Sequence, residues 1–189
     1  PHRLRLFPGV SLGTTARTAV VPRKTRDQPH AVESLFGNNM KRIEVETTFE
    51  VPIEKLFDAE RNITLHTSTQ KHHSERAISG VTEGLIELGQ EVEWEAIHFG
   101  ISQRLRVRIT HMERPHYFRD EMIHGIFKSF SHEHHFSEIE ENKTIKKDVL
   151  LLSAPLGLLG VIAENVFLGS YMKRFLQKKN LELKTILES

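Results

Sequence analysis

The chain has 189 residues, of which 27% are charged and 38% hydrophobic, proportions typical of a soluble globular protein with one sizeable core. It contains no cysteine, which excludes disulfides, thiolate zinc sites and cysteine nucleophiles. No apolar run is long enough to span a bilayer, because Ser153, Pro155, Gly157 and Gly160 interrupt the longest one. We expect a cytoplasmic protein without a transmembrane segment.

Basic residues are concentrated at the start of the chain. Residues 1–39 hold 6 basic and 2 acidic residues, which leaves 20 basic and 23 acidic residues in the other 150. The mildly acidic remainder argues against nucleic acid as a partner. Residues 1–39 also hold four prolines and lack periodicity, so we expect a disordered or loosely packed extension. We interpret it as non-native upstream sequence, and an arginine- and threonine-rich targeting segment is the alternative.

From Met40 onward the pattern predicts a single domain over residues 40–189. A strand at 42–50 precedes two short helices at 53–59 and 61–69, the first opened by Pro52. Strand-like segments follow at 74–80, 83–88, 90–98, 102–113, 117–124, 130–139 and 144–152. Apolar residues then recur at a helical period, which predicts one amphipathic helix over 156–189, about 45 Å long. A helix of that length usually has a sheet wrapped around it, so the order predicts an α+β container.

One hairpin can be predicted in register. Val92, Trp94 and Ala96 alternate with glutamates, and Leu105, Val107 and Ile109 alternate with arginines. A tight turn at Phe99-Gly100 sets Trp94 opposite Leu105 inside the fold. The same register sets Glu95, Glu93 and Glu91 opposite Arg104, Arg106 and Arg108 outside it. We therefore interpret the arginines as a solvated charge ladder, not as an anion-binding stripe.

Several segments carry a family resemblance in their order and spacing. They are Pro52-Ile53-Glu54-Lys55-Leu56-Phe57-Asp58, Glu75-Arg76-Ala77 with Gly80, Val92-Glu93-Trp94-Glu95-Ala96, Phe118-Arg119-Asp120-Glu121-Met122 with Gly125, Phe130-Ser131-His132-Glu133-His134-His135-Phe136, Asp148 and Ala154-Pro155-Leu156-Gly157. Over nearly all of residues 40–189 the chain resembles the SRPBCC (START-like, polyketide cyclase/dehydrase-like) superfamily, especially its small bacterial ligand-binding members. The resemblance implies the helix-grip fold, a curved antiparallel sheet around a long C-terminal helix. It also implies a scaffold that carries hydrophobic ligands and that some members of the superfamily use for catalysis.

The densest polar cluster comprises His132, His134 and His135, with Asp120 and Asp148 on nearby strands. His132 and His134 share one face of their strand. A turn near residues 125–129 would bring Asp120 close to His134 and Met122 close to His132. The cluster could be a structural hydrogen-bonded group inside the sheet, a polar spot that orients a ligand, or a His-x-His metal site completed by a carboxylate. We expect no metal and no cofactor, because a metal site needs three protein ligands with defined support around them.

The remaining candidates lie around the same interior. His66 falls on the second short helix, where helix-grip proteins tend to have a portal, and His98 ends the inward row that contains Trp94. We expect an apolar inner face, interrupted by Asp120, His132 and His134 and formed by Trp94, Leu105, Val107, Ile109, Phe118 and Met122. The predicted ligand-binding residues are therefore His66, Trp94, His98, Asp120, Met122, His132 and His134.

The leading hypothesis is binding of a small hydrophobic ligand, such as a lipid, a polyketide or an aromatic metabolite. The first alternative is a cyclase, dehydratase or isomerase in which Asp120 and His134 form an acid–base pair. The second is an interaction module whose interior is filled by side chains. Nucleophile-elbow and phosphate-binding glycine motifs are missing from the sequence. The oligomeric state is left open.

The first prediction separates the inner cluster from the outer ladder. Asp120→Asn or His134→Ala should alter ligand affinity or stability, since a buried carboxylate beside an imidazole depends on its partner. Arg106→Ala should change the free energy of unfolding by no more than about 0.5 kcal/mol, measured by denaturant titration. In a carrier, Asp120→Asn changes only binding; in an enzyme, turnover should collapse while the complex persists.

Overall fold

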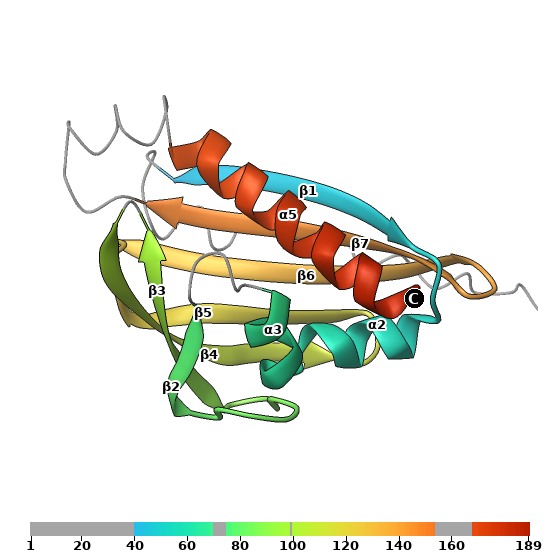
Figure 1. Ribbon diagram of the computed structural model, residues 1–189, viewed down its shortest axis with the longest axis horizontal. Helices are drawn as coiled ribbons and strands as arrows, with labels where there is room; N and C mark the ends of the chain where they lie inside the picture. Colours follow the sequence, from blue (N-terminus) through green and yellow to red (C-terminus); the bar gives the residue numbers. More distant parts are fainter. Residues whose placement is uncertain (1–39, 70–74, 99, 154–167) are drawn as a thin grey trace, which may run out of the picture.

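The computed structural model describes residues 40–69, 75–98, 100–153 and 168–189 (Figure 1). Within them lie the helices α2 (Ile53–Glu60), α3 (Ile63–Thr69) and α5 (Gly169–Leu187). The strands are β1 (Lys41–Phe49), β2 (Arg76–Gly80), β3 (Glu91–His98), β4 (Ile101–Glu113), β5 (Tyr117–Gly125), β6 (Ser129–Glu140) and β7 (Lys143–Ser153). The predictions for residues 1–39, and for a helix between 156 and 167, lie outside the described residues.

The strands form one antiparallel sheet in the order β1-β7-β6-β5-β4-β3-β2. Helix α5 lies across one face of the sheet beside β1 and β7 (Figure 1). Helix α2 lies near the C-terminal end of α5, and α3 lies below its middle (Figure 1). The first strand pairs with the last one. This arrangement confirms the predicted helix-grip fold.

Two apolar clusters pack between the helices and the sheet. In one, Phe57 of α2 makes edge contacts with Phe118 and Phe136, at centroid separations of 5.6 and 5.5 Å. In the other, Met172 and Leu176 of α5 pack on buried residues of β1 and β7. Burial of such side chains is the main stabilising term of the fold. Leu183 of α5 belongs to the first cluster, so the helix passes from one cluster to the other.

The predicted hairpin register is confirmed. Trp94 pairs with Leu105 and Val92 with Val107, and all three residues Trp94, Val92 and Val107 are buried. Outside, Arg106 and Arg108 both form ion pairs with Glu91. Charge complementarity on one face and apolar matching on the other specify the same pairing, which is why the sequence pattern was sufficient.

The predicted strand at residues 83–88 is wrong. Gly84 and Gly89 have φ angles of +72° and +81°, which break an extended strand. The segment between them hydrogen-bonds to the connection between α2 and α3, where Ile86 N donates to Arg61 O at 3.0 Å and Ile63 N donates to Gly84 O at 2.8 Å. The chain here packs against the connection between α2 and α3 instead of joining the sheet.

The predicted pairing of β5 with β6 is wrong by two residues. Asp120 pairs with His132 and Phe118 pairs with His134. The sequence analysis placed Asp120 close to His134, which the side chains confirm at 3.2 Å, but the pairing that it implied also placed Met122 close to His132. A shift of two residues leaves every side chain on its original face, so the alternation of polar and apolar residues cannot distinguish the two registers. The faces were therefore predicted correctly while the pairing was not.

Two glycines allow a matched test of backbone packing. Gly80 has φ of +76°, and a Cβ atom there would lie 2.2 Å from the carbonyl oxygen of Glu91; Gly84 has φ of +72° with open space around it. We expect Gly84→Ala to cost about 1–2 kcal/mol of unfolding free energy from backbone strain alone. Gly80→Ala should cost at least about 2 kcal/mol more, because β2 must also move away from β3. Equal costs in denaturant unfolding would contradict this packing.

Candidate functional site

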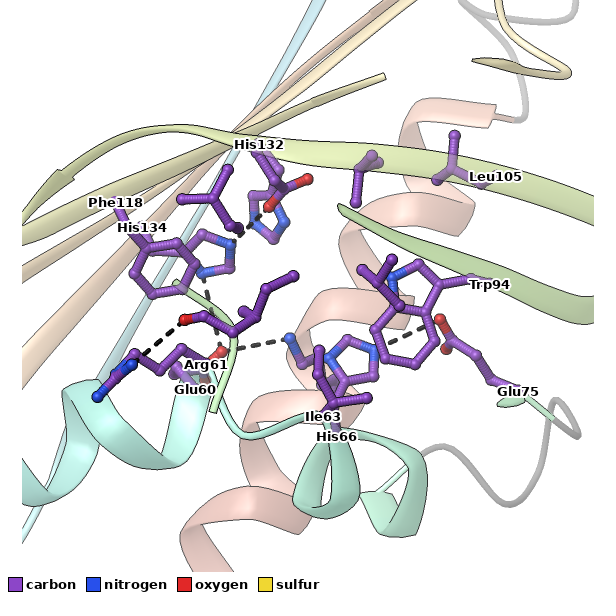
Figure 2. A pocket seen from close by; sticks show the side chains of 16 residues that line it. Glu60, Arg61, Ile63, His66, Glu75, Trp94, Leu105, Phe118, His132 and His134 are labelled. Atoms are coloured by element: carbon purple, nitrogen blue, oxygen red, sulfur yellow. Dashed lines mark hydrogen bonds and ion pairs between the residues drawn. The ribbon is translucent and has the colours of Figure 1, made fainter. Parts of the chain in front are cut away.

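A partly open cavity of about 100 Å³ lies between the sheet, the two short helices and α5 (Figure 2). Its apolar lining comprises Ile63, Ile86, Val92, Trp94, Leu105, Val107, Ile109 and Phe118. Its polar lining comprises Glu60, Arg61, His66, Glu75, Asp120, His132, His134 and Lys179. The interior therefore has apolar strand walls and a group of polar side chains at one end, which we call the polar floor and define as Asp120, His132 and His134.

Two aromatic contacts hold the walls in place. His66 stacks on Trp94 with centroids 4.3 Å apart, and His134 stacks on Phe118 with centroids 4.1 Å apart. The first stack lies across the cavity from the polar floor (Figure 2). His66 also lies 3.3 Å from a carboxylate oxygen of Glu75, measured from Nε2. Burial lowers the pKa of His66, aided by the ammonium of Lys179, although Glu75 opposes the change.

Each histidine of the polar floor faces a carboxyl group. His132 Nε2 lies 3.0 Å from Asp148 Oδ1, and His134 Nε2 lies 3.2 Å from Asp120 Oδ1. The two imidazole rings lie side by side, with centroids 3.9 Å apart. Asp120 thus reaches His134 diagonally, although His132 is its partner in the strand pairing. The structure brings together the histidine and the aspartate that the sequence analysis singled out.

Beneath the polar floor lies a charge cluster that is closed to solvent, which we define as Glu60, Lys146, Asp148, Lys179 and Asn180. The ammonium of Lys146 donates to Glu60 and to Asn180 Oδ1, and it lies 3.0 Å from Asp148 Oδ1. Lys179 Nζ lies 3.2 Å from Glu60 Oε2, and Asn180 Nδ2 donates to Asp148 Oδ2 at 2.7 Å. The cluster links α2, β7 and α5 and contains two negative and two positive charges.

The neighbouring charges decide the ionisation of this cluster. Burial alone would raise the pKa of Glu60, but the ammonium groups of Lys146 and Lys179 outweigh it and lower the pKa to about 2. Burial likewise opposes ionisation of Asp148, but Lys146 and His132 hold its pKa well below the usual range. The carboxylates in turn raise the pKa of Lys179 despite its burial. Glu60, Asp148 and Lys179 are therefore charged at neutral pH.

In the polar floor the effect of burial on the pKa values exceeds that of the neighbouring charges of opposite sign. Burial raises the pKa of Asp120 to about 6, only partly opposed by His132 and Lys179. Burial lowers the pKa of His134 well below its ordinary value, and the neighbouring His132 and Lys146 add to this effect. The floor thus holds an aspartate that is unusually easy to protonate next to an imidazole that is unusually hard to protonate.

One predicted site residue lies elsewhere, and the side chain of a second is outside the described part of the structure. Met122 lines a second hollow with Met40, Lys128 and Phe130, and it does not line the cavity that contains Trp94. His98 ends β3 opposite Ile101, and its side chain lies outside the part of the structure that is described. The other five predicted residues, His66, Trp94, Asp120, His132 and His134, all line the cavity.

Sequence reasoning missed Glu60, Lys146, Lys179 and Asn180. The sequence did contain a signal for them, because polar residues interrupt the apolar periodicity of α5 and of β7. The buried face of α5 runs through Met172, Leu176 and Leu183, and Lys179 and Asn180 fill the turn between them. On β7 the inward row that contains Leu150 and Leu152 begins with Thr144, Lys146 and Asp148. Charged residues at positions where the period predicts apolar ones indicate a buried ionic group.

Comparison with solved structures identifies the fold. The chain is similar to a protein from Thermus thermophilus, TTHA0849, with a TM-score of 0.63 at 14% identity, covering 77% of this chain and 95% of that one. A START superfamily protein from Mycobacterium smegmatis is similar with a TM-score of 0.60 at 10% identity, covering 80% and 98%. The chain has the helix-grip fold of the START-like (SRPBCC) superfamily. No protein-family model matches the sequence, and no curated protein does.

A plant protein shares the same helix-grip fold. Major latex-like protein 151 from Panax ginseng is similar with a TM-score of 0.60 at 11% identity, covering 78% of this chain and 97% of that one. Among the described residues, none of the helices combines the length and the apolar character that a bilayer crossing requires. At these identities the comparisons show the fold alone.

Two adjacent lysines of β7 test the charge cluster. Lys146 is fully buried, whereas the side chain of Lys147 is 40% exposed and pairs with Glu44 on the outer face. Lys146→Met should lower the free energy of unfolding by about 3–5 kcal/mol, because it leaves Glu60 and Asp148 with excess negative charge in the interior. Lys147→Met should cost at most about 1 kcal/mol. Similar losses in denaturant unfolding of the two variants would contradict the balanced cluster.

Proposed function

We propose that the protein binds a small, mostly apolar molecule of about one aromatic ring, with a polar group that faces Asp120, His132 and His134. The observation that carries this proposal is the cavity itself, which has apolar walls and a convergent polar end. That combination is how a pocket holds a mostly apolar molecule in one orientation. The fold shared with START-like proteins is compatible with this use.

The size of the cavity narrows the class of ligand. Pockets for drug-sized ligands usually measure about 300–1,000 Å³, whereas this one measures about 100 Å³. An engineered apolar cavity of about 150 Å³ binds benzene. Of the ligands considered from the sequence, a single-ring aromatic metabolite therefore fits better than a lipid or a polyketide.

The walls suit a flat ring. Trp94 and Phe118 each present an aromatic surface, and the branched side chains of Val107 and Ile109 lie on β4, the strand between β3 and β5. Aromatic pairs add about 0.5–1.5 kcal/mol beyond the burial of apolar area. A hydroxyl or carbonyl on the ring would then meet the polar floor, where Asp120 and His134 offer a hydrogen-bond donor and acceptor.

The same hydrogen bond favours a second candidate function. Asp120 Oδ1 and His134 Nε2 lie 3.2 Å apart at the surface of the cavity, within reach of a bound polar group. Such a pair could transfer protons to and from an enclosed substrate, as an isomerase or a dehydratase requires. Binding is the primary proposal because it requires only the cavity. Catalysis requires in addition that Asp120 and His134 transfer protons to and from the bound molecule.

The sole tryptophan of the chain provides the test. Trp94 lines the cavity, so its fluorescence should change saturably when phenol or catechol binds. Toluene has the same ring without an oxygen and should bind more weakly, since it leaves the floor without a partner. Palmitate should not bind at this site, because its chain exceeds the volume. Calorimetry of each titration checks that the fluorescence reports binding.

Matched variants assign the polar contact. Asp120→Asn should weaken phenol binding by about three- to tenfold, the value of one hydrogen bond, and leave toluene binding unchanged. Arg106→Ala, on the outer face, should leave both unchanged. If phenol and toluene bind equally in the original chain and in Asp120→Asn, the floor does not orient the ligand. If neither ligand changes the fluorescence or releases heat, the proposed function is wrong.

A further inference from the structure

The polar floor has the composition of a metal site. One ligand atom each from Asp120, His132 and His134 can be chosen so that all three lie within 4.8 Å of one another. From the sequence we expect no metal, because a metal site needs three protein ligands with defined support around them. The structure supplies the third ligand, because Asp120 lies on the neighbouring strand with Oδ1 3.2 Å from His134 Nε2, and a ring nitrogen of His132 lies within 4.8 Å of both ligand atoms.

Asp148 supports His132 in the way that metal-binding histidines are supported. His132 Nε2 lies 3.0 Å from Asp148 Oδ1, so an N–H on Nε2 can donate a hydrogen bond to this carboxylate oxygen. The proton on Nε2 leaves Nδ1 as the atom with a free lone pair, and it fixes the orientation of the ring. Histidine ligands usually donate their other ring N–H to a carboxylate or a carbonyl in this manner.

The surroundings of His134 select its other tautomer. Its Nδ1 lies 3.4 Å from Asp148 Oδ1 and 3.8 Å from Glu60 Oε2, and it makes no hydrogen bond to any described residue. Two carboxylates on that side favour a proton on Nδ1. The lone pair of Nε2 then points at Asp120 Oδ1, 3.2 Å away. Two electron pairs that face each other require a cation between them, which is either a proton on Asp120 or a metal ion.

Charge balance permits the metal ion. The two ammonium groups beside the site, Lys146 and Lys179, are neutralised by Glu60 and Asp148. An ionised Asp120 adds one negative charge, so a divalent ion would leave a net charge of +1. A hydroxide or a phenolate oxygen from the cavity would complete the balance. The remaining charge of +1 therefore favours an anionic fourth ligand, and the neutralised lysines do not prevent the metal from binding.

We propose that Asp120, His132 and His134 bind a divalent transition-metal ion such as Zn²⁺, with an open coordination position directed into the cavity. Two imidazoles and one carboxylate are ligands that Zn²⁺ accepts, and three protein ligands with one open position are typical of zinc sites that act on a bound molecule. The apolar walls described above would then surround that position.

The test uses the full chain, purified without a polyhistidine tag and treated with a chelator. Calorimetric titration with Zn²⁺ should show one equivalent bound, and Co²⁺ should give the visible absorption of a four- or five-coordinate ion. Co²⁺ should also quench the fluorescence of Trp94, which lines the same cavity. His134→Ala should weaken Zn²⁺ binding by at least 100-fold, since it removes a ligand.

The chain has 12 histidines in total, so the control must exclude metal binding by histidines outside the polar floor. His124→Ala, on an exposed position of β5, should leave Zn²⁺ affinity unchanged. If His134→Ala fails to fold by circular dichroism, Asp120→Asn keeps the size of the side chain and should still weaken binding at least tenfold.

Several results would overturn the proposal: only the spectrum of hydrated Co²⁺ in the original chain, loss of binding in His124→Ala, or unchanged binding in Asp120→Asn. Because the titration uses the metal alone, failure here leaves the proposed binding of an aromatic molecule standing. Conversely, the metal could bind as proposed while phenol and catechol do not.

Discussion

The ion pairs of Lys146 with Glu60 and Asp148 are the constraint on which the rest of the interior depends. All three side chains are closed to solvent, so each charge relies on the others for compensation. Lys179 and Asn180 of α5 bind the same two carboxylates. The long helix is therefore positioned on the sheet by polar contacts at its middle and by apolar contacts on either side.

This arrangement determines the chemistry above it. Asp148 stays ionised because of Lys146, and it can therefore hold the ring of His132. Asp120 lies farther from the ammonium groups, and burial raises its pKa to about 6. Two carboxyl groups on neighbouring parts of one sheet thus differ in ionisation because of their surroundings. The polar floor therefore combines two oriented imidazoles with Asp120, which takes no part in the ion pairs of the charge cluster. This combination is suited to bind a polar group or a cation.

The sequence predicted the fold well because its patterns are local. The charge ladder of the β3–β4 hairpin defined one register, and residues Trp94, Asp120, His132 and His134 were correctly placed on the inner face. The β5–β6 register was missed because a shift of two residues preserves the faces. The charge cluster was missed because a buried lysine such as Lys146 is identified only by partners that are distant in sequence, here Glu60 on α2. The volume of the cavity, which narrows the ligand class, depends on packing that no single-sequence pattern reports.

The central claim is that the cavity encloses a ligand between its apolar walls and its polar floor. Native mass spectrometry of the freshly purified chain tests this most directly, with the same sample measured again after denaturation. The account predicts an additional mass that matches a single-ring compound, present under native conditions and released on unfolding. The mass of the polypeptide alone in repeated native preparations, or an additional mass that matches a long-chain lipid, would contradict it.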